Sequence, residues 1–261
     1  PPCLGAIPET EMKGELPPSH SWQERNYTAV PLQFLNEVER LVSEHVDIDA
    51  VLSVATTALP FQFDDHLPIV PFRQCRIAVA DDSCFSLCFQ DNADLLRLLG
   101  AEIVQFCPLA DSSLPAGIGG LYLPGAYLRE YGEAIAANRA LHQSIREFAS
   151  AGGVIYSEGA GTAVLCRTFE PERSGTRYEG VGLIPFDAIR GDGSRRSLVG
   201  TVVDDSILAS PGSSIKGYTT GEWTMKRADS DGAGVFDVMR FQGPDEEILQ
   251  PMLSATAQSC S

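Results

Sequence analysis

The chain has 261 residues, of which 44% are hydrophobic, so it can bury an ordinary core in one large domain or in a domain with an appendage. The 35 acidic and 19 basic residues give a formal net charge of -16, which repels phosphate backbones and anionic membranes. No stretch approaches the roughly 20 apolar residues of a membrane span. We therefore expect a globular, soluble protein without nucleic-acid partners or a membrane span.

Seven cysteines are scattered along the chain without C-x-x-C spacing. An odd number in this pattern indicates neither a disulfide framework nor a zinc site, and no histidine stands at ligand spacing beside Cys84 and Cys88, which would share a face only in a helix. We expect no metal, no cofactor and a reducing compartment: the cytoplasm, or an organelle stroma or matrix if the chain is processed. The start at Pro1 has no signal-peptide pattern, which argues against secretion, and it suggests a processed precursor or a fragment.

Residues 1–74 are expected to form an N-terminal segment that is largely helical. After a Pro-rich opening, apolar residues recur at helical spacing from Leu35 to Val42. A second helical run begins near Asp47 and should end at Pro60. The stretch 61–73 carries two further prolines and is typical of a linker, so a new domain is expected over 75–261.

From residue 75 onward, short apolar strands alternate with helices. We expect strands at 77–80, 103–106, 120–123 and 154–156, a helix at 92–99, and one long helix over 134–150 whose apolar face is Ala137, Leu141, Ile145 and Phe148. This alternation predicts an α/β fold with a mostly parallel sheet flanked by helices. Shorter runs at 182–184, 198–203 and 234–239 predict an added antiparallel part.

The most informative stretch is the strand-to-helix corner Val154-Ile155-Tyr156-Ser157-Glu158-Gly159-Ala160-Gly161. An apolar strand enters a sharp turn of small residues and a helix begins at once, which is the geometry that aims a nucleophile into an active site. The residue at the tip is Gly159, which has no side chain. Neither a P-loop nor a complete GxGxxG after a strand is present, so independent nucleotide binding is not expected.

Several stretches resemble, in order and spacing, the C-terminal glutaminase domain of cobyrinic acid a,c-diamide synthase and cobyric acid synthase, a class I glutamine amidotransferase-like domain. They are 76–80, 85–91, 98–102, 106–111, 114–115, 138–139, 152–158 and 181–185. Residues 1 to about 70 are similar to the tail of the family's ATP-using domain through 4–8, Leu16-Pro17 and His20. The sequence contains no part of the phosphate-binding half of that domain.

The resemblance implies a reaction in which a corner cysteine attacks the amide of glutamine, a histidine moves protons and backbone N–H groups hold the oxyanion. The ammonia released amidates a carboxylate that ATP has activated. Here the cysteine position is Gly159. The family's Gly-His/Tyr-Glu-x-His motif best matches 217–221, with Thr219 at the glutamate position and Gly221 at the second histidine position. The glycine-rich oxyanion turn is represented by 125–129, Gly-Ala-Tyr-Leu-Arg.

Two other residues could be considered as nucleophiles. Cys166 lies seven residues beyond Gly159, about two helical turns or roughly 10 Å along the axis, so we expect a buried thiol that packs the helix against the sheet. Ser157 precedes the tip and should point away from Glu158, with no histidine in the local motif to activate it. Neither is expected to replace the missing cysteine.

For the remaining polar residues, an ordinary structural role is set beside a functional one. His142, within the long helix, is expected to be an ordinary surface or boundary histidine, and His20 a loop histidine with a possible earlier role at a substrate interface. Glu158 and Glu222 flank the two glycine positions. They either form a residual polar pocket or, as the plainer expectation, are solvated or capping carboxylates.

The vestigial pocket is therefore expected to consist of Gly125, Ala126, Tyr127, Glu158, Gly159, Ala160, Gly221 and Glu222, with no catalytic residue. Damage to three separate elements favours an inactive glutaminase-like domain that serves as a structural or binding subunit among other protein chains. Glycine at a tight turn is also what backbone sterics favour once function demands no side chain. Two alternatives stay open: part of a working ATP-dependent amidotransferase that takes ammonia from solution and whose ATP-using half lies elsewhere, and a small-molecule binding module.

Overall fold

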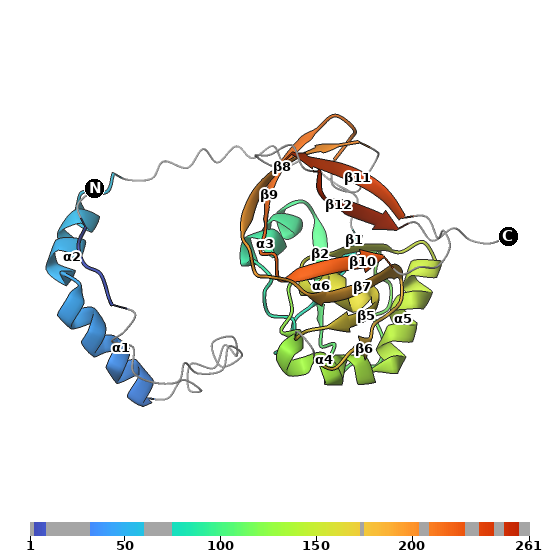
Figure 1. Cartoon of the computed structure of the whole chain (residues 1–261), viewed down its shortest axis with the longest axis horizontal. Helices are drawn as coiled ribbons and strands as arrows, with labels where there is room; N and C mark the ends of the chain where they lie inside the picture. The colour runs from blue at the N-terminus through green and yellow to red at the C-terminus, as the bar shows by residue number, and fades with distance from the viewer. Residues whose placement is uncertain are drawn as a thin grey trace. The chain divides into compact units, whose positions relative to one another are not determined.

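The computed structural model describes residues 3–8, 32–59, 75–172, 175–203 and 209–227, and the backbone of two strands at 235–242 and 248–255. It divides the chain into two compact units, residues 1–70 and 71–261, which are treated separately below (Figure 1). Over the described ranges, no helix combines the length and the apolar character that crossing a bilayer requires.

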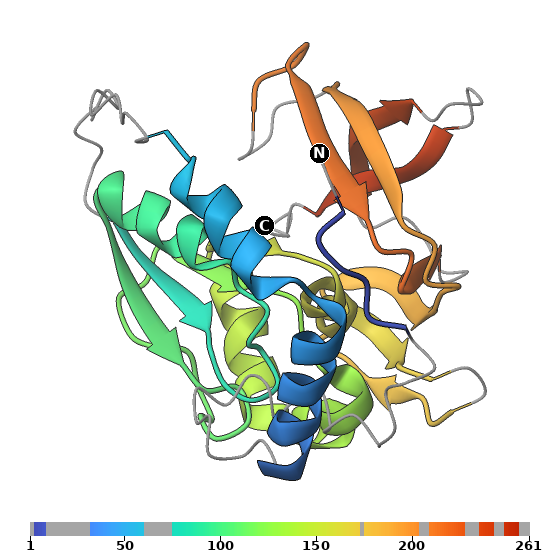
Figure 2. The same ribbon diagram turned by 90° about the vertical axis from the view of Figure 1, so that its left-hand side faces the viewer.

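The N-terminal unit contains α1 (Leu32–His45) and α2 (Ile48–Thr56), drawn in blue in Figure 2, so the expected helical segment is confirmed. Asp47 caps α2 by accepting a hydrogen bond from the Ala50 N–H at 2.9 Å. The helix ends at Thr56, earlier than the predicted stop at Pro60. The hydroxyls of Thr56 and Thr57 bind carbonyls of the last turn at 2.7 Å, which competes with helix continuation. His20 and the predicted linker lie outside the described residues.

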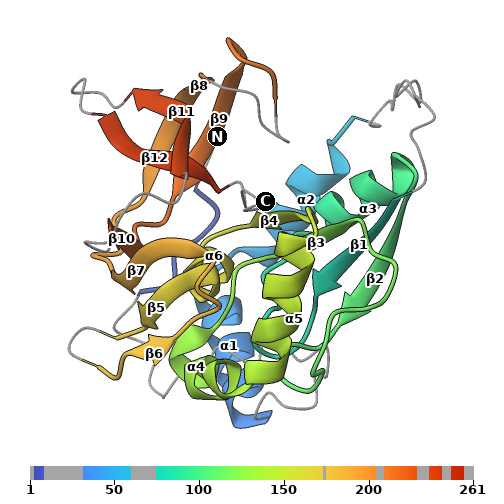
Figure 3. The same ribbon diagram turned by 90° about the vertical axis from the view of Figure 1, so that its right-hand side faces the viewer.

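The second unit is built on a four-stranded parallel sheet of order β2-β1-β3-β4. Its strands are β1 (Cys75–Ala80), β2 (Ala101–Phe106), β3 (Gly120–Leu123) and β4 (Val154–Ser157). The buried ends of β1 and β3 are continuous apolar runs, as expected where both faces of a sheet are covered. Helix α3 (Gln90–Leu98) packs beside β2, and α5 (Arg139–Ser150) lies across the opposite face (Figures 1 and 3). The predicted parallel sheet is confirmed.

The long helix predicted over 134–150 is wrong, because the chain forms two helices that meet at Asn138. They are α4 (Leu128–Ala137) and α5. The Asn138 side chain accepts from the Leu141 N–H at 3.2 Å to start α5, and it donates to the carbonyls of Pro108 and Asp111 at 2.9 and 2.8 Å. Ala137 therefore ends α4 and is exposed, instead of sharing the apolar face of α5.

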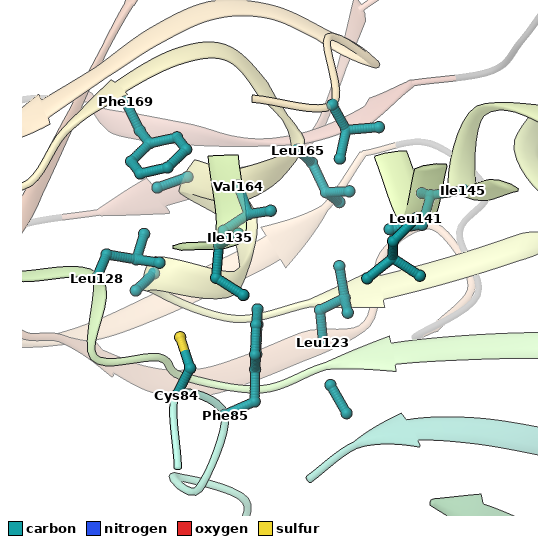
Figure 4. Close-up of a cluster of buried hydrophobic side chains, with 14 of the residues drawn as sticks. Cys84, Phe85, Leu123, Leu128, Ile135, Leu141, Ile145, Val164, Leu165 and Phe169 are labelled. Atoms are coloured by element: carbon teal, nitrogen blue, oxygen red, sulfur yellow. The ribbon is translucent and has the colours of Figure 1, made fainter. Parts of the chain in front are cut away.

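The expectation for His142 is also wrong, since its side chain is only 1% exposed. The face of α5 that packs on the core is wide enough to include the position after Leu141 as well as Ile145. Figure 4 shows the surrounding core, to which the sheet, α4, α5, the short helix α6 (Ala160–Leu165) and the loop after β1 all contribute side chains. Ala160, at the start of α6, belongs to this core, which thus fixes the end of the corner to the rest of the unit.

Beyond α6 the chain forms two further sheets, which confirm the predicted antiparallel addition. One has the order β10-β7-β5-β6, from β5 (Cys166–Glu170), β6 (Tyr178–Glu179), β7 (Ile184–Arg190) and β10 (Trp223–Arg227). The other, fully antiparallel, has the order β12-β11-β8-β9, from β8 (Arg196–Val202), β9 (Ser214–Thr219), β11 (Val235–Gln242) and β12 (Ile248–Ala255). Strand β7 starts only at Ile184, because Gly182 (φ +79°) forms a turn whose N–H binds the Cys166 carbonyl.

Candidate functional site

The corner retains the geometry of a nucleophile position while presenting no nucleophile. The Glu158 N–H bonds the Leu123 carbonyl at 3.0 Å, and the Thr162 N–H bonds the Gly159 carbonyl at 3.1 Å, so the turn is fixed on both sides. Gly159 has φ +50° and ψ -121°, a conformation that favours glycine. A Cβ atom there would meet no atom within 4 Å. A side chain at this position would therefore project into open space.

The first turn of α6 is pressed against the end of β3. A Cβ at Gly161 would lie 2.4 Å from the carbonyl oxygens of both Leu123 and Pro124, a distance that real Cβ atoms do not adopt. Only glycine permits this approach of helix and strand. The contact places the corner directly beside the turn that follows β3, which the sequence resemblance predicts to be the counterpart of the family's oxyanion turn.

The turn at 125–129 is held by the loop after β1. Gly125 pairs with Leu87 in an isolated antiparallel bridge, and the Tyr127 N–H donates to the Cys84 carbonyl at 2.9 Å. Arg129, which is predicted to stand at the glutamate position of the family's turn, forms an exposed ion pair with Glu172 at 2.8 Å. The Tyr127 N–H is thus already engaged and is not free to hold an oxyanion.

Gly221, which is predicted to stand at the second histidine position, is enclosed by backbone. It has φ +60°, and a Cβ there would lie 2.4 Å from the Ser194 carbonyl oxygen. The carbonyls of Gly221 and Glu222 accept hydrogen bonds from the N–H groups of Gly193 and Gly191, at 3.0 and 2.7 Å. A histidine at 221 would require the loop 191–194 to move, so the local packing itself demands glycine.

The expected pocket residues therefore fall into two groups. Residues 125–127 and 158–160 are neighbours, joined through the end of β3. Exposed Glu222 belongs to the turn before β10, and it is close enough to Tyr127 for its charge to act on that residue. The pKa of Tyr127 is raised, first by burial and then by the charges of Glu130 and Glu222. The turn at 221–222 thus lies near Tyr127 and brings a carboxylate, but no imidazole, to that side of the corner.

Glu158 is the centre of a polar cluster that the sequence did not reveal. Its carboxylate accepts hydrogen bonds from the hydroxyls of Tyr156 at 2.7 Å and Tyr122 at 3.1 Å, and Asn92 donates to the Tyr122 oxygen at 3.3 Å. The pKa values of both tyrosines are raised, chiefly by burial and further by the Glu158 charge. Glu158 is thus a partly buried carboxylate that is hydrogen-bonded by two tyrosines, and no helix-capping bond from its side chain is found among the described residues.

The Cys88 thiol lies close enough to this polar cluster for Tyr122 and Glu158 to affect its pKa. It lies in the loop 81–89, which is not helical, so it does not share a helix face with buried Cys84. Burial raises the pKa of the Cys88 thiol, a Tyr122 hydrogen bond opposes this, and the charges of Glu158 and Asp81 raise it further. The thiol form is favoured, whereas a nucleophile needs the thiolate.

The other polar candidates are also poorly placed to act as a nucleophile or a base. Cys166 is fully buried, and its pKa is raised to about 12 by burial and by Asp187. Ser157 shares a hydrogen bond with the Thr162 hydroxyl at 2.9 Å. His142, the only histidine in the sequence of residues 71–261, lines an apolar void with Phe106 and Leu141, and neither ring nitrogen has a hydrogen-bond partner of good geometry. Over the ranges that the structure describes, no three His, Cys, Asp or Glu side chains gather as metal ligands.

Comparisons with known proteins agree with this architecture. The cobyrinate a,c-diamide synthase of Listeria monocytogenes is 29% identical over 229 residues, which cover 83% of this chain and 48% of that protein. The synthase of Methanosarcina acetivorans is 30% identical over 201 residues, covering 70% of this chain and 40% of that protein. The chain therefore spans about half the length of the curated relatives it matches.

The fold has a counterpart among solved structures. The structure of PurLQS from Thermotoga maritima superposes with a TM-score of 0.50 at 18% identity, covering 67% of this chain and 80% of that one, a likeness of fold alone. The family model of the CobB/CobQ-like glutamine amidotransferase domain matches residues 76–222, more than half of the chain. The resemblance inferred from the sequence is confirmed: the chain belongs to the CobB/CobQ-like glutamine amidotransferase domain family.

Proposed function

We propose that this glutamine amidotransferase-like domain does not hydrolyse glutamine and serves as a structural or binding subunit of a larger protein assembly. The observation that carries the proposal is the corner, where the backbone is shaped for a nucleophile and Gly159 supplies none. Attack on an amide carbonyl needs a thiolate or an activated hydroxyl at that point. The hydrogen bonds on both sides of the turn keep the backbone of the corner in place, which suits recognition.

The second support is that no neighbouring group compensates. The pKa values of Cys88 and Cys166 are raised, so both thiols stay protonated at neutral pH. The loop 191–194 closes over Gly221, and His142 is enclosed in the apolar core. Restoring the cysteine alone would therefore leave it without an imidazole base among the described residues.

A second candidate function is favoured by the extent of the matches. The alignment with the Listeria synthase covers 83% of the chain, more than residues 76–261 alone provide, so it includes part of the N-terminal segment. This supports the assignment of 1–74 to the tail of an ATP-using domain. In that case the chain is part of an ATP-dependent amidotransferase whose other half lies upstream or in another chain, and ammonia comes from solution.

One experiment separates the two. The chain is combined with the ATP-using half of a cobyrinate a,c-diamide synthase, and ATP-dependent amidation of cobyrinate is measured with ammonia or with glutamine as the nitrogen donor. Amidation with ammonia alone supports the second candidate and agrees with a corner that does not hydrolyse glutamine. No amidation with either donor favours the subunit role. Amidation with glutamine, abolished by a thiol alkylator, contradicts both.

A further inference from the structure

Helix α2 carries an apolar face that is exposed to solvent. Ile48, Val51, Leu52 and Ala55 recur at the spacing that places them along one side of the helix, and this set is called the α2 face below. None of the nine residues of α2 is buried. An amphipathic helix in a stable domain buries its apolar side against another element. The element that should cover the α2 face is therefore missing from the described residues.

The described part of the N-terminal unit buries too little apolar surface to form a core of its own. An extended segment pairs with the junction of the two helices through a bridge from Gly5 to Val46. Helix α1 buries only Leu41, whereas Leu32 and Leu35 are exposed like the α2 face. Short chains with so small a core are seldom stable alone. The exposed helices thus call for a further packing partner.

The extent of the sequence matches indicates which protein supplies that partner. The match to the Listeria synthase covers 83% of this chain, so it reaches into residues 1–74, but it covers only 48% of that protein. The resemblance predicts that residues 1 to about 70 correspond to the tail of the family's ATP-using domain. A segment that is one part of a domain exposes the faces that the rest of the domain covers.

We propose that the α2 face docks on an apolar surface of the ATP-using half of the synthase. This inference rests on the second candidate function given above. A lipid surface is a poor alternative occupant, because helices that lie on membranes carry Lys and Arg on their polar side. Helix α2 contains neither residue, its first turn holds Asp49, and the chain has a formal net charge of -16.

Co-expression tests the proposal with the full chain and the part of the Listeria synthase that this chain does not match. Co-purification and size-exclusion chromatography measure the complex. Val51→Glu/Leu52→Glu places two carboxylates on the α2 face and should reduce the recovered complex at least about tenfold, because both charges would have to be desolvated. The matched control is Leu95→Glu/Leu98→Glu, the same change on two exposed leucines of α3 in the other unit. This control should form the complex as the wild type does.

Two further measurements separate docking from a loss of folding. Val51→Ile/Leu52→Met keeps the face apolar and should form the complex at the wild-type level. Because Val51 and Leu52 are 39% and 59% exposed, the glutamate pair should unfold at the wild-type urea concentration in the free chain. In the complex, the backbone amides of 48–56 should exchange hydrogen at least about tenfold more slowly than in the free chain.

The outcomes distinguish the proposal from the function on which it rests. Loss of the complex in the α2 glutamate pair alone, with slowed exchange at 48–56, supports the proposal. Equal complex formation by the α2 and α3 pairs overturns the proposal and leaves the second candidate function standing. No complex with the wild type overturns both. Self-association of the wild-type chain that the α2 pair abolishes, or a lower urea midpoint of that pair, also overturns the proposal, because the face would then already be covered.

Discussion

Gly159 and Gly221 are predicted from the sequence to stand at positions of catalytic residues in the family, and their surroundings differ in a way that matters for any attempt to restore activity. At Gly159 a side chain has room but the backbone is strained for it, whereas at Gly221 the Ser194 backbone leaves no room. A cysteine can therefore be introduced at 159 at a modest cost, but a histidine at 221 requires a rearranged loop. The thiol and the imidazole would have to return together.

The two glycines of the corner should respond differently to alanine. Gly159→Ala should lower the free energy of unfolding by about 1–2 kcal/mol, because its positive φ is unfavourable for an L side chain. Gly161→Ala should cost more, about 3 kcal/mol, because its Cβ would overlap two carbonyl oxygens. Urea denaturation of both variants measures the difference. Equal losses would show that α6 does not approach β3 as described.

His142 should make the unit sensitive to acid. Burial, with the charges of Arg139 and Arg146, lowers its pKa from 6.5 to about 4. Between pH 6.5 and about 4, His142 is protonated in the unfolded chain but stays neutral in the folded chain. The free energy of unfolding therefore falls as the pH is lowered through this window, by up to about 3 kcal/mol. Chemical denaturation at several pH values should show a smaller fall for His142→Leu than for wild type. Parallel pH profiles would contradict the burial of an uncharged ring.

The polar cluster at Glu158 shows what local sequence reasoning misses at the residue scale. Tyr122 is 36 positions from Glu158, and the contact arises only because parallel pairing of β3 and β4 sets Tyr122 beside Tyr156. The corner itself could be predicted, since its small residues and its strand are contiguous. The cluster could not, because its partners depend on the order of strands in the sheet.

At the scale of elements, the break between α4 and α5 illustrates a different limit. The apolar periodicity through 134–150 favours one continuous helix. Asn138 interrupts it because its amide finds acceptors at Pro108 and Asp111, some 30 positions earlier in the chain. A helix end that is fixed by distant carbonyls leaves only a weak local signal. The strands, in contrast, follow from short apolar runs bounded by turns, and their predicted positions agree closely with β1 to β4.

Asn138→Ala should therefore lower the free energy of unfolding more than most substitutions of a partly buried polar side chain do. It removes a helix cap, worth about 1 kcal/mol, and two hydrogen bonds to carbonyls, worth about 1 kcal/mol each, so a loss of about 2–3 kcal/mol is expected. Gln143→Ala, on the exposed side of α5, is the matched control and should change the stability by no more than about 0.5 kcal/mol. Thermal and urea unfolding measure both. Similar stabilities of the two variants would argue for a continuous helix in solution.

At the scale of the whole molecule, composition and charge limited the classes of partner, and motif order identified the family. What remained beyond the sequence was the state of the pocket, because room at Gly159 and crowding at Gly221 are properties of packing. The assignment of residues 1–74 and the presence of partner chains stay predictions. The chain spans about half the length of the cobyrinate a,c-diamide synthases that it matches.

If the corner keeps its backbone without a nucleophile, the chain should release no glutamate from glutamine, and an assay of that release decides the question. Purified wild-type chain and Gly159→Cys are assayed beside the Listeria synthase as a positive control. We expect no release above buffer for either form, because the wild type has no thiol at the tip and the variant has no described imidazole beside it. Glutamate release by the wild type, abolished by a thiol alkylator, would contradict the account.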